Sequence, residues 1–270
     1  MRLIATDLDG TLLDSSSHVS PRTRAALDAA RERGIHVVPV TARQPIGLRA
    51  IAADAAFDGW ALCSNGAYAV HLTDERMLFA EELPADTIRT LAEALRASIP
   101  GLLFASVRDA GETFVAQEGY AAIADLTDHK RAPETMGGVA FDDVVSAPSV
   151  KFVIRHPELA PAALFDTLRS LGLPGFEATL SGAPFVEVMA EGVTKATGLA
   201  RLCAHLGIDR ADVVAFGDAL NDVEMLRWAG HGVAMAGAEA VVQDAADEST
   251  ASNDDDGVAQ VIERMLGISA

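Results

Sequence analysis

Cysteine is scarce in this 270-residue chain, which contains only Cys63 and Cys203. These two residues have neither metal-ligand spacing nor enough partners for a disulfide framework, so we expect two buried thiols in a reducing compartment. Long apolar runs are absent as well: no stretch of 18 apolar residues occurs, and Asp7 interrupts the N-terminus before a signal peptide could form. The sequence therefore predicts a cytoplasmic protein with no membrane span and no membrane partner.

Basic residues are also few, because 21 Lys and Arg stand against 39 Asp and Glu, which gives a formal net charge of −18. The electrostatic field of such a negatively charged protein repels polyanions, so we expect no nucleic-acid partner. Hydrophobic residues make up 50% and charged residues 22%, which is typical of a folded globular protein. At ~150 residues per domain, the length suggests about two domains or one large α/β domain with an insertion.

Both ends of the chain alternate strand-like and helix-like segments. Residues 2–6, 35–40 and 60–63 are short apolar, β-prone runs with helical patterns between them. This order gives β-α-β-α-β, the pattern of a doubly wound, mostly parallel sheet in an α/β fold. The same alternation resumes after residue 190 and ends in a helix over residues 257–266.

The middle of the chain has a different pattern. A helix is expected in LPADTIRTLAEALRASIP, and strands are expected in LLFASV, ETFVAQ, VKFVIRH, GFEATL and FVEVMA. Strands with few helices between them predict an antiparallel sheet with helices on one face. The sequence therefore predicts an α/β core over residues 1–82 and 190–270, interrupted by an inserted α+β module over residues 83–189.

Two pairs of acids follow predicted strands. Asp7 and Asp9 come directly after residues 2–6, and Asp218 and Asp222 come after the apolar run VVAF. The carboxyl ends of parallel strands meet at one edge of a sheet, so we expect all four acids in one crevice. They would repel one another without a cation, and oxygen ligands of this kind suit Mg²⁺. The alternatives are turn-forming acids and a helix cap, but a cap explains four acids poorly.

Two further residues could hold an anion at the same edge. Lys195 is one of three lysines and stands at the expected start of a helix, where its ammonium group suits a phosphate beside a carboxylate. Thr41 follows the strand over 35–40, where its hydroxyl and the next amide could hold a phosphate oxygen. Taken singly, each has an ordinary alternative, an exposed helix lysine and a strand-end hydroxyl.

A run of acids lies near the C-terminus, from Asn253 to Gly257. We expect a solvated loop whose acidic side chains cap the last helix. The run is too short and irregular to form an EF-hand calcium loop.

Four short segments stand out together: DLDGTLL at 7–13, Thr41-Ala42-Arg43, Lys195, and GDALND at 217–222. In order and spacing they resemble the motifs of the haloacid dehalogenase-like (HAD) phosphatases. The closest likeness is the Cof-type branch with a large α/β cap, type IIB. Other segments, such as the one around Asn65, also resemble this family, so that the resemblance covers nearly the whole chain. One departure is Ala42, which replaces the usual glycine and could change how closely the backbone approaches a phosphate.

This resemblance implies a HAD-like Rossmannoid core and a covalent mechanism. Asp7 would be the nucleophile that forms an aspartyl-phosphate. Asp9 would protonate the leaving alcohol and then activate the hydrolytic water. Asp7, the backbone carbonyl of Asp9, and Asp218 would hold Mg²⁺.

The resemblance also implies how the phosphate is held. The residues expected to bind its oxygens are Leu8, Thr41, Ala42, Lys195 and Asn221. Asp222 would orient Lys195 or a metal-bound water, and Arg43 and Asn65 are candidates for contact with the substrate.

The expected function is a Mg²⁺-dependent phosphatase for small phosphorylated metabolites, with sugar phosphates as the family-level expectation, acting as a monomer or small homo-oligomer. Its specificity should lie in residues 83–189, whose 8 basic and 14 acidic residues sum to −6 and offer no basic trap for a polyphosphate. The alternatives are a sugar phosphomutase that uses the same aspartyl-phosphate and a non-catalytic ligand-binding protein. The GDxxND form favours hydrolysis, and the presence of every reacting residue argues against a non-catalytic protein.

Overall fold

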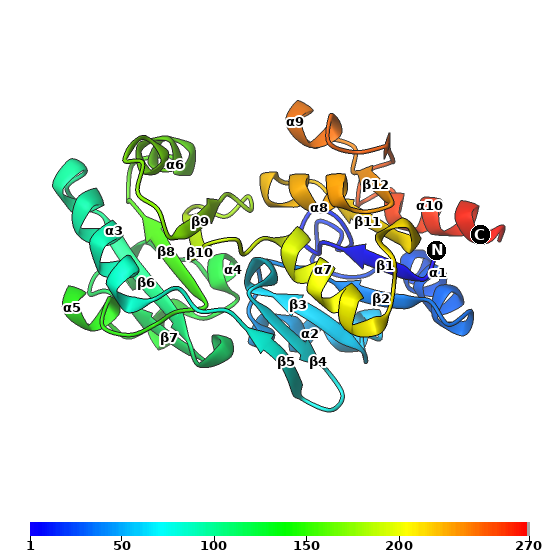
Figure 1. Cartoon of the computed structure of the whole chain (residues 1–270), viewed down its shortest axis with the longest axis horizontal. Helices are drawn as coiled ribbons and strands as arrows, with labels where there is room; N and C mark the ends of the chain where they lie inside the picture. The colour runs from blue at the N-terminus through cyan, green and yellow to red at the C-terminus, as the bar shows by residue number, and fades with distance from the viewer. Residues whose placement is uncertain (269–270) are drawn as a thin grey trace. The chain divides into compact units, whose positions relative to one another are not determined.

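The computed structural model describes residues 1–268, which form two compact units (Figure 1). The first unit comprises Met1–Ala42, Leu48–Phe79 and the described part of Thr194–Ala270. The second unit comprises Arg43–Gly47 and Ala80–Val193. The short segment Arg43–Gly47, which the sequence assigns to the core, thus groups with the second unit.

A five-stranded parallel sheet forms the centre of the first unit, in the order β13-β12-β11-β1-β2. Its strands are β1 (Leu3–Thr6), β2 (His36–Pro39), β11 (Val213–Gly217), β12 (His231–Ala234) and β13 (Glu248–Ser249). The helices that alternate with them are α1 (Pro21–Glu32), α2 (Pro45–Ala55), α7 (Lys195–Leu206), α8 (Val223–Trp228), α9 (Ala240–Gln243) and α10 (Gly257–Leu266). The parallel α/β fold expected from the sequence is therefore confirmed.

Both faces of this sheet are covered. Leu3 and Ala5 of β1 pack with Leu199 of α7 on one face. Ile4 of β1 and its partner Val214 of β11 belong to the opposite face and are also buried. Strand β1 pairs in register with β11, Thr6 opposite Phe216. The residues that follow these two positions, Asp7 and Gly217–Asp218, therefore leave the sheet at the same edge.

Strand β3 (Trp60–Cys63) departs from the expected β-α-β-α-β pattern. It meets the parallel sheet through the bridge between Val40 and Leu62 rather than through a full ladder with β2. Its main partner is β4 (Tyr68–His71), which runs antiparallel and belongs with β5 (Arg76–Ala80) to a three-stranded sheet. The reason is a tight turn after Cys63, which reverses the chain before a helix can form.

The second unit is built on a five-stranded antiparallel sheet, in the order β7-β6-β8-β10-β9. Its strands are β6 (Leu103–Arg108), β7 (Thr113–Ala116), β8 (Lys151–Arg155), β9 (Phe176–Thr179) and β10 (Val186–Ala190). Its helices are α3 (Ala85–Ser98), α4 (Leu126–His129), α5 (Phe141–Val144) and α6 (Pro161–Ser170). Alternate strand residues such as Phe104, Phe152 and Val188 form a core with Leu91 of α3 and Leu164 of α6.

Several polar side chains are buried in this unit, on its strands and in the helical segments beside them. Lys151 of β8 forms an ion pair with Glu187 of β10 at 2.6 Å, and both side chains are buried. The Tyr120 hydroxyl and His129 Nε2 are hydrogen-bonded at 2.7 Å. The His129 ring also stacks on Phe185, with ring centroids 4.5 Å apart. Burial and the nearby cations, foremost Lys151, lower the pKa of His129 to about 3.

This lowered pKa predicts acid sensitivity of the second unit. His129 must be neutral in the folded state, so its contribution to stability is complete above pH ~6.5 and is lost as the pH falls toward 3. We expect this group to lower the free energy of unfolding by up to about 1.4 kcal/mol per pH unit in that range. Urea denaturation of the parent and of His129→Gln between pH 7 and 5 measures it. Equal slopes in the two proteins would contradict this prediction.

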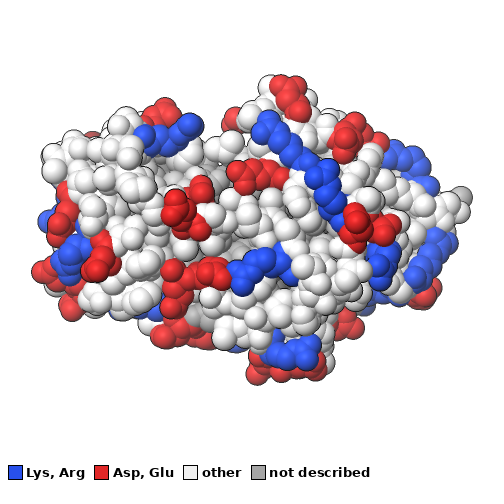
Figure 2. Space-filling view, viewed as in Figure 1, with Lys and Arg blue, Asp and Glu red and all other residues white. Residues whose placement is uncertain are grey.

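Charged side chains of both signs are scattered over the face shown in Figure 2, as the composition leads one to expect. Over residues 1–268, none of the helices has the length and apolar character needed to cross a membrane.

Candidate active site

Three of the four acids expected at the sheet edge, Asp7, Asp218 and Asp222, come together beside one buried lysine, whereas Asp9 is exposed. Lys195 is the first residue of α7, and its side chain is fully buried. Its Nζ lies 2.9 Å from Asp7 Oδ1 and 2.7 Å from Asp222 Oδ1. The exposed-lysine alternative is therefore wrong for Lys195. Burial alone would lower the pKa of this lysine, but the charges and hydrogen bonds of the two carboxylates outweigh burial and raise it, so the ammonium stays charged.

Asp222 organises the loop that follows β11. Its Oδ2 accepts hydrogen bonds from the backbone amides of Asp218 and Ala219, both at 3.0 Å. Gly217 makes room for this arrangement, since a Cβ there would lie 2.4 Å from the Asp222 Cβ. Both carboxylate oxygens of Asp222 are thus engaged by Lys195 and the loop, which orients the ammonium group toward Asp7.

Asp218 is tied to the loop after β1. Its Oδ1 accepts a hydrogen bond from the Thr11 hydroxyl at 2.6 Å. Gly10 lies against the other oxygen, because a Cβ at this residue would lie 2.4 Å from Asp218 Oδ2, and its φ of +80° is favourable for glycine alone. Burial, together with the neighbouring acid Asp222, raises the pKa of Asp218 to about 6.

Asp7 is buried among the other charged groups of the cluster. It follows β1 directly, and its amide donates to the Phe216 carbonyl at 3.0 Å. Burial and the neighbouring carboxylates of Asp222 and Asp218 raise its pKa well above the usual range, although Lys195 acts in the opposite direction. Asp7, Asp218 and Asp222 each offer an oxygen within 4.8 Å of the others.

The donor set of this cluster fits a hard divalent cation. Three carboxylates and one ammonium carry a formal net charge of −2 in a largely buried place. Over residues 1–268, the second oxygen of Asp7 and that of Asp218 accept no hydrogen bond, in contrast to those of Asp222. Oxygen-only ligands with this charge are typical of divalent-cation sites such as those for Mg²⁺.

A left-handed turn, Ser64–Gly66, borders the lysine. Its three residues all have positive φ, at 51°, 58° and 89°. A Cβ on Gly66 would lie 2.4 Å from the Thr194 carbonyl oxygen at the start of α7, so only glycine permits this approach. Such strained backbone persists only where its surroundings hold it. Here the turn lies directly against the start of α7, which carries Lys195.

Asn65 and Asn221 meet at this turn. The amide nitrogen of Asn221 donates to Asn65 Oδ1 at 2.9 Å, and both side chains are almost fully buried. Asn221 Oδ1 and the Ser64 hydroxyl are buried without a partner among the described residues. Both asparagines were candidates from the sequence, but their contact was not predictable, because nothing in the residue pattern links positions so far apart.

The remaining candidate residues are distributed as follows. Thr41 is fully buried. Its amide donates to the Leu62 carbonyl at 2.9 Å, and its carbonyl accepts from the Asn65 amide at 3.0 Å. Leu8 is fully buried, whereas Asp9 is exposed in the loop after β1. Ala42 is half-buried at the end of the first unit's N-terminal segment. Arg43 groups with the second unit, where its guanidinium donates to the Gly47 carbonyl at 3.2 Å.

One family model and several known proteins are similar to this chain. A family model described as haloacid dehalogenase-like hydrolase matches residues 4–262. The 5-amino-6-(5-phospho-D-ribitylamino)uracil phosphatase YcsE of Bacillus subtilis (strain 168) is 28% identical over 268 residues, covering 98% of this chain and 96% of YcsE. The pyridoxal phosphate phosphatase YbhA of Escherichia coli (strain K12) is 30% identical over 270 residues, covering 97% of both chains.

Solved structures share the fold over the full length. The HAD subclass IIB sugar phosphatase BT4131 superposes with a TM-score of 0.84 at 23% identity, covering 100% of both chains. A haloacid dehalogenase-like hydrolase from Bacteroides thetaiotaomicron gives a TM-score of 0.76 at 29% identity, covering 98% of this chain and 99% of that one. The chain belongs to the haloacid dehalogenase-like hydrolases and is one of the family's phosphatases, a phosphoric monoester hydrolase.

Proposed function

We propose that this phosphatase hydrolyses small phosphate monoesters through an aspartyl-phosphate formed on Asp7, with Mg²⁺ as its cation. The observation that carries the proposal is the buried Lys195 ammonium, 2.9 Å from Asp7 and 2.7 Å from Asp222. A positive charge fixed at this edge can meet an arriving phosphate, and it favours the ionised form of Asp7 against the burial that raises its pKa. The ammonium group also needs no rearrangement during the reaction, because Asp222 already holds it in place.

The cation would be held by Asp7, Asp218 and the backbone carbonyl of Asp9. When bound, Mg²⁺ would neutralise charge on the phosphoryl oxygens and on the crowded carboxylates. This assignment leaves Asp222 to Lys195 and the loop amides, in agreement with the hydrogen bonds of its two oxygens.

The first chemical step is attack on phosphorus by a carboxylate oxygen of Asp7. A bond forms between this oxygen and phosphorus while the bond from phosphorus to the ester oxygen breaks. Asp9, exposed in the same loop, gives its proton to the departing alkoxide. In the second step the Asp9 carboxylate takes a proton from water, whose oxygen attacks phosphorus and releases inorganic phosphate and the Asp7 carboxylate.

Phosphate oxygens would be bound at several points around Asp7. The proposed groups are the Lys195 ammonium, the amide of Asn221, the Thr41 hydroxyl, and the backbone amides of Leu8 and Ala42. Asn65 supports this set through its contact with Asn221 at 2.9 Å. Its near-complete burial favours that supporting role over direct contact with substrate.

Removal of the cation is expected to stop turnover. A chelator should abolish phosphate release, and added Mg²⁺ should restore it. Asp218→Ala should raise the Mg²⁺ concentration for half-maximal activity by roughly tenfold or more, since it removes a charged ligand and the partner of Thr11. A Mg²⁺ titration of initial rates measures this shift. Full activity in chelator, or an unchanged midpoint in the variant, would remove the cation from the site.

We further propose that the inserted module, residues 83–189, selects the substrate and that sugar phosphates are the preferred class. The named relatives act on different phosphorylated compounds, a ribitylaminouracil phosphate and pyridoxal phosphate. A panel of phosphorylated metabolites with Mg²⁺, scored by released inorganic phosphate, tests this function. Phosphate release without a bisphosphate activator is expected, whereas an isomeric sugar phosphate as product would identify a phosphomutase.

A further inference from the structure

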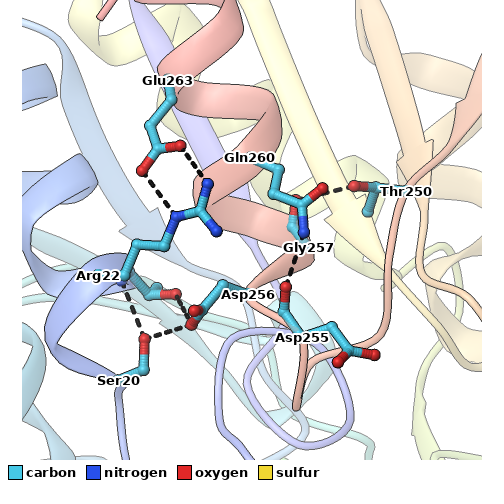
Figure 3. A network of polar contacts seen from close by, with 9 residues as sticks. Ser20, Arg22, Thr250, Asp255, Asp256, Gly257, Gln260 and Glu263 are labelled. Carbon is cyan, nitrogen blue, oxygen red and sulfur yellow. Dashed lines mark hydrogen bonds and ion pairs between the residues drawn. The ribbon is translucent and has the colours of Figure 1, made fainter. Parts of the chain in front are cut away.

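The acidic run near the C-terminus does not cap the last helix through Asp256, contrary to expectation. Asp256 stands at the N-cap position of α10 with a left-handed backbone, but its side chain makes no capping hydrogen bond. Instead, its carboxylate accepts from the hydroxyls of Ser20 and Thr23 at the start of α1 (Figure 3). The run therefore connects the C-terminus to the segment between β1 and α1.

Two more contacts reach the loop that carries Asp9. The side-chain amide of Asn253 donates to the Leu13 carbonyl at 2.8 Å. The carboxylate of Asp254 accepts from the Ser15 amide at 2.7 Å. Residues 253, 254 and 256 thus hold the chain at three successive points after β1.

The Ser252–Gly257 turn, which makes these contacts, is itself rigidly held. The Gly257 amide donates to the Ser252 carbonyl at 3.0 Å, and a Cβ on Gly257 would lie 2.2 Å from the Ala251 carbonyl oxygen. Helix α10 is anchored beside α1 by the bidentate pair of Arg22 and Glu263, at 3.0 and 2.7 Å (Figure 3).

The contact with Leu13 bears directly on the position of Asp9. The Leu13 amide donates to the Leu8 carbonyl at 2.9 Å, and Leu13 forms a β-bridge with Asp9. Leu13 is buried and paired with Asp9 through this bridge, so a shift of Leu13 also shifts the Asp9 backbone and with it the carboxyl group. A restraint on Leu13 is therefore a restraint on Asp9.

We infer that Asn253 is a positioning residue for Asp9: it fixes the loop after β1 so that the Asp9 carboxyl group meets the leaving oxygen. This inference rests on the proposed function. A displaced proton donor matters most when the leaving group is a poor one, because an alkoxide must be protonated as it departs. A p-nitrophenolate leaves as an anion and needs little help. A contact that served stability alone would affect both esters equally.

The test compares two esters in each protein: p-nitrophenyl phosphate and glycerol 2-phosphate. For Asn253→Ala, kcat/KM is expected to fall by roughly tenfold on glycerol 2-phosphate and by less than about threefold on p-nitrophenyl phosphate. The isosteric Asn253→Asp, which removes the donor without changing volume, should give the same difference. The matched control is Asp255→Ala, because Asp255 accepts from Ser252 within the same turn and, over residues 1–268, has no such contact with the loop. It should change neither rate constant by more than about twofold.

Equal losses on both esters, or no loss, would overturn the inference and leave Asn253 as a contact for stability alone. Should Asn253→Ala fail to fold, Asp254→Ala carries the same test, since Asp254 holds Ser15 of the same loop. Failure of the proposed function gives a different result: the parent protein would hydrolyse neither ester, or Asp7→Asn would hydrolyse both at the parental rate. Either result would also overturn the inference.

Discussion

Asp7→Asn is expected to lower kcat/KM for any phosphate monoester by roughly 10³-fold or more. The asparagine amide fills the same space next to Lys195, 2.9 Å away in the parent, but its oxygen is a poor nucleophile toward phosphorus. Initial rates of phosphate release in saturating Mg²⁺ measure the loss. Mass spectrometry must accompany them, since deamidation of the introduced asparagine would restore the parent enzyme.

The same substitution is expected to leave the fold intact. Burial and two neighbouring acids already raise the pKa of Asp7, so an uncharged side chain there removes a cost of the folded state. We expect the midpoint of thermal unfolding without Mg²⁺ to stay level or to rise. A folded Asp7→Asn protein with parental turnover would contradict the assignment of the nucleophile.

Lys195→Met is expected to lower kcat/KM by roughly 10²-fold or more, which corresponds to about 2.7 kcal/mol of transition-state stabilisation. Methionine keeps most of the volume but removes the charge that lies between Asp7 and Asp222. The phosphate would then meet a cluster of carboxylates without its ammonium. Steady-state kinetics on p-nitrophenyl phosphate, normalised to the folded fraction from circular dichroism, measure the loss.

A matched control separates this effect from the cost of breaking a buried ion pair. Lys151→Met breaks the Lys151–Glu187 pair of the second unit, whose side chains are also buried. Both variants should lose stability, by ~3–5 kcal/mol for the loss of one partner of a buried ion pair. Only Lys195→Met should lose turnover on p-nitrophenyl phosphate. Equal kinetic losses in the two variants would mean that Lys195 acts through stability alone.

Much of the fold follows from local pattern. The strand over 35–40 and the helix over 257–266 were predictable because apolar periodicity and helix-end residues agree there. Strands β4 and β5 were not, because their direction is set by the left-handed turn Ser64–Gly66. Two of its residues are not glycine, and a positive φ at Ser64 and Asn65 comes from surrounding structure that local propensity does not encode.

Some features of the candidate site were likewise predictable from the sequence, and others were not. The grouping of Asp7 with Asp218 was predictable, since both residues follow parallel strands of one sheet. The role of Asp256 was not, because the hydroxyls of Ser20 and Thr23 compete with the amides of its own helix for the carboxylate. That competition is decided by the packing of α1 beside α10, elements from opposite ends of the chain (Figure 1).

The configuration at phosphorus after hydrolysis shows whether an aspartyl-phosphate forms on Asp7. A phosphate ester made chiral with oxygen isotopes is hydrolysed in isotopically labelled water, and the configuration of the released phosphate is determined. Two in-line displacements, first by Asp7 and then by water, each invert the configuration at phosphorus, so we expect net retention. Net inversion would mean that water attacks the ester directly, and it would contradict a covalent intermediate.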